Sequence, residues 1–191
     1  MEKHCESAKR FRKEGDGGQG SFGFAASTDE APGAKAAKLR VPIYRVTLLR
    51  DGTLVKESLE TCDSPLAAAS LVREFLGDAP EEHFVTLVVD VRHRVIGISE
   101  VSRGTLSSSL VHPRETFRTA ILLNAAGIIV SHNHPSGDCQ PSPEDKETTR
   151  RLTRAGAILG IPLLDHVIVG EPDPQGGAGK FFSFREHGLL S

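Results

Sequence analysis

The sequence has few of the residues that mark secreted proteins, thiolate metal sites or membrane proteins. Its 191 residues include three Cys, one Tyr, one Met and no Trp. The cysteines are odd in number and form no CxxC pair, so they predict neither a disulfide framework nor a Cys-based zinc module. No apolar run approaches the roughly 18 residues that span a bilayer, and the charged N-terminus lacks the apolar stretch of a signal peptide. These absences predict a cytoplasmic protein without a membrane segment.

An excess of positive charge is also missing. The chain has 23 Lys and Arg against 25 Asp and Glu, which gives a formal net charge of −2. A surface that coats a polyanion needs a basic excess, so any contact with nucleic acid would be local. Aromatic residues that could stack on single-stranded bases are sparse between residues 44 and 180. DNA is therefore only weakly supported as a partner.

Residues 1–40 differ in composition from the rest of the chain. Eight of the first fourteen residues are charged, and a Gly-rich stretch follows at residues 15–24. Such a segment cannot bury enough apolar area to offset the entropy of ordering, so we expect a flexible arm. Residues 41–191 are expected to form one domain, which begins with a β-hairpin at residues 41–60 and has its metal-site core at residues 64–188.

Helix and strand signals alternate through this domain. Two of the expected helices begin with a Ser-Pro pair, at Ser64 and Ser142, where the serine caps the helix. The expected elements are, in chain order, helix 65–77, strands 83–91 and 94–102, a helix from 113, strand 128–132, helix 143–159, and strands 163–170 and 180–184. This order predicts an α/β fold with a mixed β-sheet flanked by helices. Leu152, Ala155 and Leu159 are expected to face inward.

A candidate metal site follows the strand at residues 128–132. Side chains at positions i and i+2 of a strand project from one face, so His132 and His134 can converge while Asn133 points away. Asp145 falls in the first turn of the next helix, where exposed N–H groups and the helix dipole favour a carboxylate. Two histidines and one carboxylate make a three-ligand set with a fourth position left for water, which is the pattern of a catalytic zinc site.

Each of these residues also has an ordinary structural role. An HxH pair occurs in many strands that bind no metal, and Ser142 and Asp145 form the S-x-x-D pattern of a helix capping box. The metal interpretation depends on the conjunction of two histidines on one strand face, an irregular loop and an acid at a helix start.

The segment HNHPSGD, followed by PSPED, resembles the JAMM (MPN+) metalloprotease motif in its RadC branch. The segments at residues 109–138 and 160–170 are similar to that branch as well, and the resemblance covers about residues 64–188. It implies a cytidine-deaminase-like α/β fold and zinc held by His132, His134 and Asp145. It further implies that Ser142 stabilises an oxyanion and that an upstream glutamate is the general base.

Three glutamates are candidates for that base: Glu82, Glu100 and Glu115. In JAMM proteins the glutamate precedes a strand that follows the first domain helix, and Glu82 matches this position best. Among the other histidines, His83 and His93 are expected at surface positions. His166 is expected to be a packed strand residue near Asp165, with a role in supporting the metal ligands as an alternative.

The implied function is that of a zinc-dependent metallopeptidase or isopeptidase in which zinc-bound water attacks an amide carbonyl of a peptide or protein substrate. The alternative is a DNA repair-associated accessory protein or nuclease of the RadC type. RadC relatives often carry an N-terminal helix-hairpin-helix region, which residues 1–40 do not resemble, so direct DNA binding is expected to be weak. An inactive MPN scaffold would have lost the ligands that this chain keeps. The sequence predicts no oligomeric state and no specific substrate.

Overall fold

A computed structural model of the chain describes residues 52–53, 61–77, 79–104, 111–174 and 179–190. The predicted arm at residues 1–40 lies outside the described residues, as does the predicted hairpin at residues 41–60 except for Gly52 and Thr53. None of the helices in the described ranges is long and apolar enough to cross a membrane.

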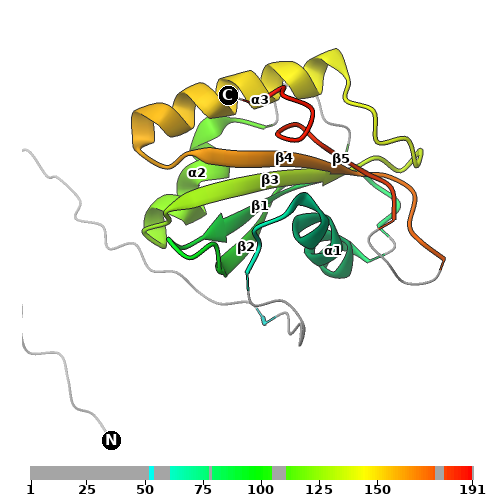
Figure 1. The fold of residues 1–191 in the computed structure, drawn as a ribbon, viewed down its shortest axis with the longest axis horizontal. Coiled ribbons are helices and arrows are strands. Elements are labelled where there is room, and N and C mark those ends of the chain that lie inside the picture. The colour runs from blue at the N-terminus through cyan, green and yellow to red at the C-terminus, as the bar shows by residue number, and fades with distance from the viewer. Residues whose placement is uncertain (1–51, 54–60, 78, 105–110, 175–178, 191) are drawn as a thin grey trace, which may run out of the picture. The chain divides into compact units, whose positions relative to one another are not determined.

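A mixed sheet of five strands forms the centre of the domain (Figure 1). The strands are β1 (His83–Val89), β2 (Val95–Arg103), β3 (Gly127–Asn133), β4 (Leu163–Val169) and β5 (Phe181–Ser183). Their order across the sheet is β2-β1-β3-β4-β5, and only β3 and β4 are parallel. A parallel pair needs a crossover connection, and the helix between these two strands supplies it. The predicted α/β fold with a mixed sheet is confirmed.

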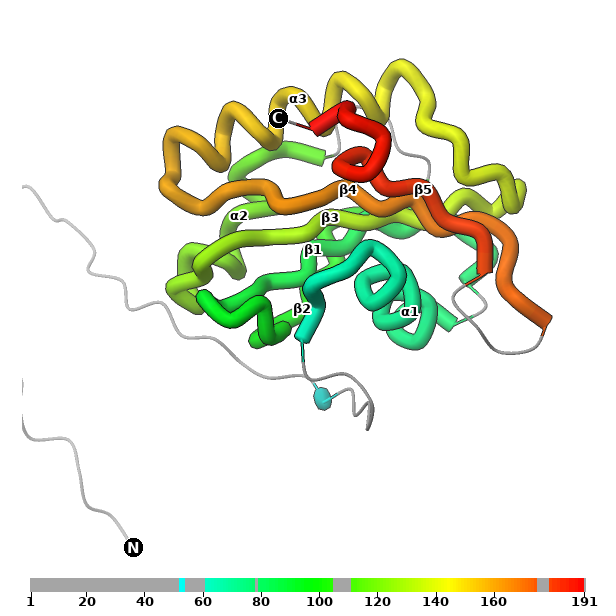
Figure 2. The backbone as a smooth tube through the Cα atoms, viewed as in Figure 1, coloured from blue at the N-terminus to red at the C-terminus, as the bar shows by residue number. Residues whose placement is uncertain are grey.

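Three helices cover the two faces of the sheet: α1 (Pro65–Leu76), α2 (Pro113–Leu122) and α3 (Pro143–Leu159). Figure 2 shows α1 on one face, with α2 and α3 on the other. Each helix has proline at its first position after a capping side chain, which comes from Ser64, His112 or Ser142. Gly160 in the left-handed conformation ends α3. The two helices predicted from Ser-Pro pairs therefore begin where the sequence indicated.

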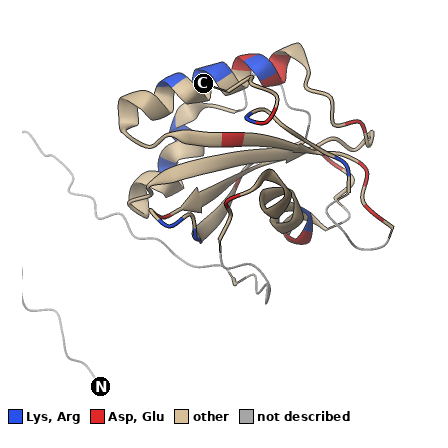
Figure 3. Cartoon of the chain, viewed as in Figure 1, with Lys and Arg blue, Asp and Glu red and all other residues tan. Residues whose placement is uncertain are grey.

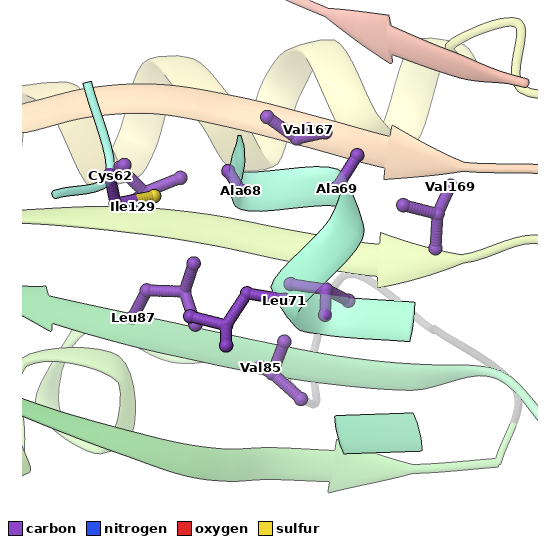
Figure 4. Packing of buried hydrophobic residues seen from close by; sticks show 10 residues of the cluster. Cys62, Ala68, Ala69, Leu71, Val85, Leu87, Ile129, Val167 and Val169 are labelled. Atoms are coloured by element: carbon purple, nitrogen blue, oxygen red, sulfur yellow. The ribbon is translucent and has the colours of Figure 1, made fainter. Parts of the chain in front are cut away.

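Two hydrophobic clusters fill the space between the sheet and the helices. Alternate residues of β1 point to opposite faces, so Val85 and Leu87 pack under α1 while Phe84 and Val88 pack under α2 and α3. Figure 4 shows the α1 cluster, in which Leu71 lies over the sheet. All seven residues of β1 are buried, because the strand is internal and covered on both faces. This rigid centre carries the residues of the candidate site at one end of β1 and β3.

Two predictions about single side chains were wrong. Leu159 is 44% exposed, because it lies in the last turn of α3, beyond Gly156, the last buried residue of that helix. His83 is buried because it begins the internal strand β1, and its Nδ1 lies 2.8 Å from Glu100 Oε2 on β2. His93, by contrast, is exposed in the turn between β1 and β2, as expected.

Candidate metal centre

The two histidines of the HxH pair converge at the carboxyl end of β3. His132 is the second-last residue of the strand and is fully buried, whereas His134 follows the strand and its side chain is 19% exposed. Their Nε2 atoms lie 3.0 Å apart. Together with a carboxylate oxygen of Glu82, these nitrogens form a group within 4.8 Å of one another that could hold a metal ion. The i and i+2 spacing on a strand therefore brings the two rings together, as the sequence indicated.

Asp145 reaches the same place from the first turn of α3. Its Oδ1 lies 3.3 Å from His132 Nε2, and its Oδ2 lies 3.7 Å from His134 Nε2. Oδ2 also accepts hydrogen bonds from the backbone N–H of Ser142 at 2.8 Å and from the Ser142 hydroxyl at 2.7 Å. The capping box and the metal-facing position are thus compatible, because Oδ2 completes the cap while Oδ1 is directed at His132.

Glu82 is the one of the three candidate glutamates that lies beside the histidines. Its Oε1 is 4.0 Å from His132 Nε2 and 3.9 Å from His134 Nε2. Glu100 instead contacts the His83 ring, and Glu115 pairs with Arg114 and Arg118 on the surface of α2. The geometry thus separates Glu82 from the other two acids, while its role as a general base stays a prediction.

The proton on His134 can be assigned from its hydrogen-bond partner. His134 Nδ1 lies 2.6 Å from the backbone carbonyl oxygen of Asp138. A carbonyl oxygen only accepts, so Nδ1 carries the proton and donates it. In the neutral ring, Nε2 then holds a lone pair directed toward His132.

The proton on His132 follows from a chain of three hydrogen bonds. Thr149 Oγ1 donates to the backbone oxygen of Asp145 at 2.7 Å, so it must accept from His166 Nδ1, also at 2.7 Å. His166 in its neutral form then accepts at Nε2 from His132 Nδ1, at 2.8 Å. His132 Nε2 is therefore a lone pair as well, because the ring's one proton is on Nδ1.

Burial keeps both of these rings neutral. Desolvation lowers the pKa of His132 to about 4, although the negative charge of Asp145 opposes the shift. Burial also lowers the pKa of His166 well below its ordinary value, with the nearby His132 ring acting in the same direction. Packing fixes the ring planes, since Phe84 stacks on His132 and Phe184 stacks on His166. The neutral His132 ring, and the His134 ring in its neutral form, direct Nε2 lone pairs at one small space lined by carboxylates, a donor set that suits a divalent metal cation such as zinc.

The sequence of this domain matches that of a known family. The profile of the RadC-like JAB domain matches residues 62–189, which include every residue of the cluster described above. The chain belongs to the RadC family. The resemblance that the HNHPSGD segment predicted is thereby confirmed.

The RadC family includes many proteins similar to this chain. A UPF0758 protein of Desulforudis audaxviator (strain MP104C) is 48% identical over 159 residues, covering 82% of this chain and 64% of that protein. A UPF0758 protein of Rubrobacter xylanophilus is 47% identical over 127 residues, covering 66% and 52% of the two chains. UPF0758 protein BamMC406_2419 of Burkholderia ambifaria (strain MC40-6) is 44% identical over 161 residues, covering 83% and 59%. The chain therefore spans between about half and two thirds of the length of these curated relatives.

Sequence reasoning missed two residues of this RadC-family site. Thr149 was not singled out, although it lies four residues after Asp145 and hence on the same face of α3. Asn133 was expected only to point away from the histidines, yet its side chain bonds to the backbone of the segment that carries Glu82. His166 is a packed strand residue whose backbone N–H bonds Asp165, as predicted, and its ring contacts His132 and Thr149, which favours the alternative that it supports a metal ligand.

Two cavities border the site and share one edge. The smaller, of about 410 Å³, is lined by Glu82, His134, Pro135, Ser136, Ser142, Glu144 and Asp145. The larger, of about 800 Å³, also contacts His134, Pro135 and Ser136, and extends toward α1 and the segment after β4. Only the smaller cavity is lined by Glu82 and Asp145 as well as His134, so it is the cavity that opens onto the candidate metal centre.

Proposed function

We propose that this RadC-family domain is a zinc-dependent hydrolase of the JAMM metallopeptidase type, which cleaves an amide bond in a peptide or protein. The observation that carries the proposal is the pair of Nε2 lone pairs, 3.0 Å apart, beside the carboxylates of Asp145 and Glu82. The JAB-domain family to which the chain belongs supports the same chemistry.

In this proposal His132, His134 and Asp145 hold the zinc ion. Asp145 is favoured over Glu82 as the third ligand because Asp145 Oδ1 lies 3.3 Å from His132 Nε2, against 4.0 Å for Glu82 Oε1. Three protein ligands with one open position are typical of catalytic zinc sites. A bound zinc ion lowers the pKa of a coordinated water toward about 7 and so supplies a nucleophile at neutral pH.

Glu82 has the position of a general base in this arrangement. Its Oε1 is nearly equidistant from the two Nε2 atoms, at 4.0 and 3.9 Å, and its side chain is 21% exposed in the wall of the smaller cavity. A carboxylate there can take a proton at Oε1 and return it to the leaving amine. Glu82 would thus hold the proton between the two halves of the reaction.

Ser142 is proposed to stabilise the developing oxyanion. Its Oγ accepts from the Asp145 N–H at 3.1 Å and donates to Asp145 Oδ2 at 2.7 Å. Rotation about Cβ–Oγ can redirect the hydroxyl hydrogen toward a substrate carbonyl, while a lone pair of Oγ keeps the bond from the Asp145 N–H. Ser142 also lines the smaller cavity, where a substrate carbonyl would lie.

The surface charge offers no reason to propose a DNA-directed activity as a second function. The acidic side chains of α3 lie near its N-terminal end (Figure 3), where Arg150 pairs with Glu147 at 2.6 Å. A nucleic-acid interface would instead need a continuous basic surface. The smaller cavity, which Glu82, Ser142 and Asp145 line, is the place where a peptide substrate would bind.

Metal analysis and a peptidase assay test the proposal together. The wild-type protein should contain one zinc per chain and release new amino termini from a mixed peptide library. His134→Ala should lose both zinc and turnover, because it removes one Nε2 donor. Glu82→Gln should keep zinc and lose at least 100-fold in turnover, because it removes the base and not a ligand.

His93→Asn is the matched control, since His93 lies in an exposed turn where Asn tolerates the positive φ of 58°. This variant should retain both zinc and turnover. A wild-type protein without zinc would overturn the metallopeptidase proposal. Full activity of Glu82→Gln would overturn the role of Glu82 as general base.

A further inference from the structure

Asn133 lies between the two histidines but faces away from them. Its Oδ1 accepts a hydrogen bond from the backbone N–H of His83 at 2.7 Å, and its Nδ2 donates to the backbone oxygen of Glu81 at 2.8 Å. The N–H group can only donate and the carbonyl can only accept, so the orientation of the carboxamide is fixed. The two bonds are made to the residues immediately before and after Glu82.

This side chain continues the pairing of two central strands. The last pair of the β1–β3 ladder is Phe84 with His132, so Asn133 stands opposite His83. At that position the carboxamide of Asn133 provides the donor and the acceptor that a peptide group of a paired strand would provide. An aspartate would lack the donor, a leucine would lack both groups, and a glutamine would be one methylene too long.

The backbone around Glu82 is held from the other side as well. The Glu82 carbonyl oxygen accepts from the Gly104 N–H, which follows β2, at 2.8 Å. The His83 ring is buried and contacts Glu100 on β2. Glu82 precedes β1, and these bonds hold the backbone on both sides of the point where its side chain leaves it.

We propose that Asn133 is a positioning residue that holds the Glu82 carboxylate beside the two histidines. The segment 132–134 at the end of β3 then has two functions. Its outer residues present Nε2 atoms on one face, and its middle residue holds the backbone beside Glu82 on the other face. The distances from Glu82 Oε1 to the two nitrogens, 4.0 and 3.9 Å, are maintained by this clamp. The assignment of Glu82 as a base rests on the proposed function, whereas the clamp itself needs no metal.

The first experiment tests the clamp in the metal-free protein. Asn133→Leu removes both hydrogen bonds with little change in side-chain size, and the His83 amide should then exchange its hydrogen at least tenfold faster. Asn133→Asp keeps an oxygen for the His83 N–H and should leave that exchange close to the wild-type rate. Thr153→Val is the matched control, because it removes one partly buried hydrogen bond, to Thr149, away from Glu82.

The second experiment measures whether the clamp determines the distance of Glu82 from the metal. Bound Co²⁺ broadens the NMR signals of nearby nuclei with the inverse sixth power of their distance. Broadening of the Glu82 side-chain signals should fall at least twofold in Asn133→Leu and in Asn133→Asp, because both variants lose the bond to Glu81. Broadening of the His166 ring should not change, because His166 is held by Thr149 and His132. A purely structural role of Asn133 would leave the Glu82 signals as broad as in the wild type.

The outcomes separate this inference from the proposed function. Unchanged exchange at His83 in Asn133→Leu, or unchanged broadening of Glu82, would overturn the positioning role. A loss of Co²⁺ affinity as large as that in His134→Ala would also overturn it, since Asn133 would then act on the ligands. If the wild-type protein takes up neither zinc nor Co²⁺, the metallopeptidase proposal fails and the positioning role fails with it, while the exchange measurement still shows whether the clamp exists.

Discussion

His132 is held from inside the fold, whereas its neighbour His134 is held from the surface. The His132 ring bonds the ring of His166 on β4, which is in turn held by Thr149 on α3. The His134 ring is instead fixed by the carbonyl of Asp138, four residues further along the same loop. Two equivalent donors of one site therefore depend on different parts of the molecule. The buried side ties the site to the core, and the solvent side leaves it accessible.

The largest expected difference between the two sides is in stability. In metal-free protein, His132→Ala should lower the free energy of unfolding by about 4 kcal/mol, because it leaves a buried cavity and removes the donor to His166. His134→Ala should lower it by less than about 1 kcal/mol, since water can replace the ring at the exposed carbonyl of Asp138. Urea unfolding in the presence of a chelator measures both values. Equal losses would contradict the division into a buried and a solvent side.

A pH dependence of stability should distinguish the two sides next. The folded-state pKa of His132 is about 4, below its ordinary value of 6.5, because of burial. The unfolded chain therefore binds the proton more readily between these values, and stability is lost as the pH falls from about 6.5 toward 4. The loss should be on the order of 3 kcal/mol for this group. Urea unfolding of metal-free protein across this range should show it.

Two matched variants show whether this pH dependence comes from the buried His132 or from the partly exposed His134. His132→Gln should reduce the fall in stability between pH 6.5 and 4 to the part that the buried His166 ring contributes, because the His132 ring no longer titrates. His134→Gln should retain most of it. If both variants keep the wild-type dependence of stability on pH, the burial of His132 does not cause that dependence.

A smaller effect is expected when the support of His132 is weakened. Thr149→Val preserves the shape of the side chain but removes the acceptor for His166 Nδ1, so the proton on His132 Nδ1 is less well fixed. Zinc affinity should fall about tenfold, as is typical when a partner of a histidine ligand is lost. Competition with a chromophoric chelator measures the change. The control Thr153→Val should bind zinc as the wild type does, and equal affinity of Thr149→Val would refute the hydrogen-bond chain.

The smallest effect is expected on the solvent side, at Gly137. Its φ of +83° is unfavourable for alanine, and its N–H donates to the His134 carbonyl at 2.9 Å. Gly137→Ala should cost about 1 kcal/mol of stability and about threefold in zinc affinity, by displacing the loop that holds His134. Gly188→Ala is the matched control, since Gly188 has a φ of +67° and open space around its Cα. It should cost the same stability without any change in affinity.

Local signals in the sequence were sufficient for much of the fold. The helix at residues 143–159 was predicted with its observed ends, and the Ser142-Pro143 pair marked its start. The convergence of His132 and His134 needed only the two-residue period of a strand. Both features depend on neighbours in the chain, and such features can be predicted without knowing which strands pair.

Features that depend on strand pairing could not be predicted in this way. The burial of His83 and its contact with Glu100 require β1 to be an internal strand beside β2. The bonds of Asn133 require the register that places it opposite His83, some 50 residues earlier in the chain. The ring partner of His166 lies on the neighbouring strand β3. The residues around each of these positions carry no signal of the distant partner. The sequence therefore indicated which groups can form hydrogen bonds, but not the residues with which they form them.

The capping box at the start of α3 also makes the helix an indicator of ion binding. Asp145 Oδ2 closes the first turn of the helix while Oδ1 is directed at His132. A cation that binds Oδ1 immobilises the same carboxylate that holds the turn, so ion affinity and the local stability of that turn are reciprocally linked. Hydrogen exchange at the Ser142 amide, which donates to Oδ2, should therefore slow as the centre fills. The occupancy of the site could then be followed from a backbone signal alone, before any substrate is known.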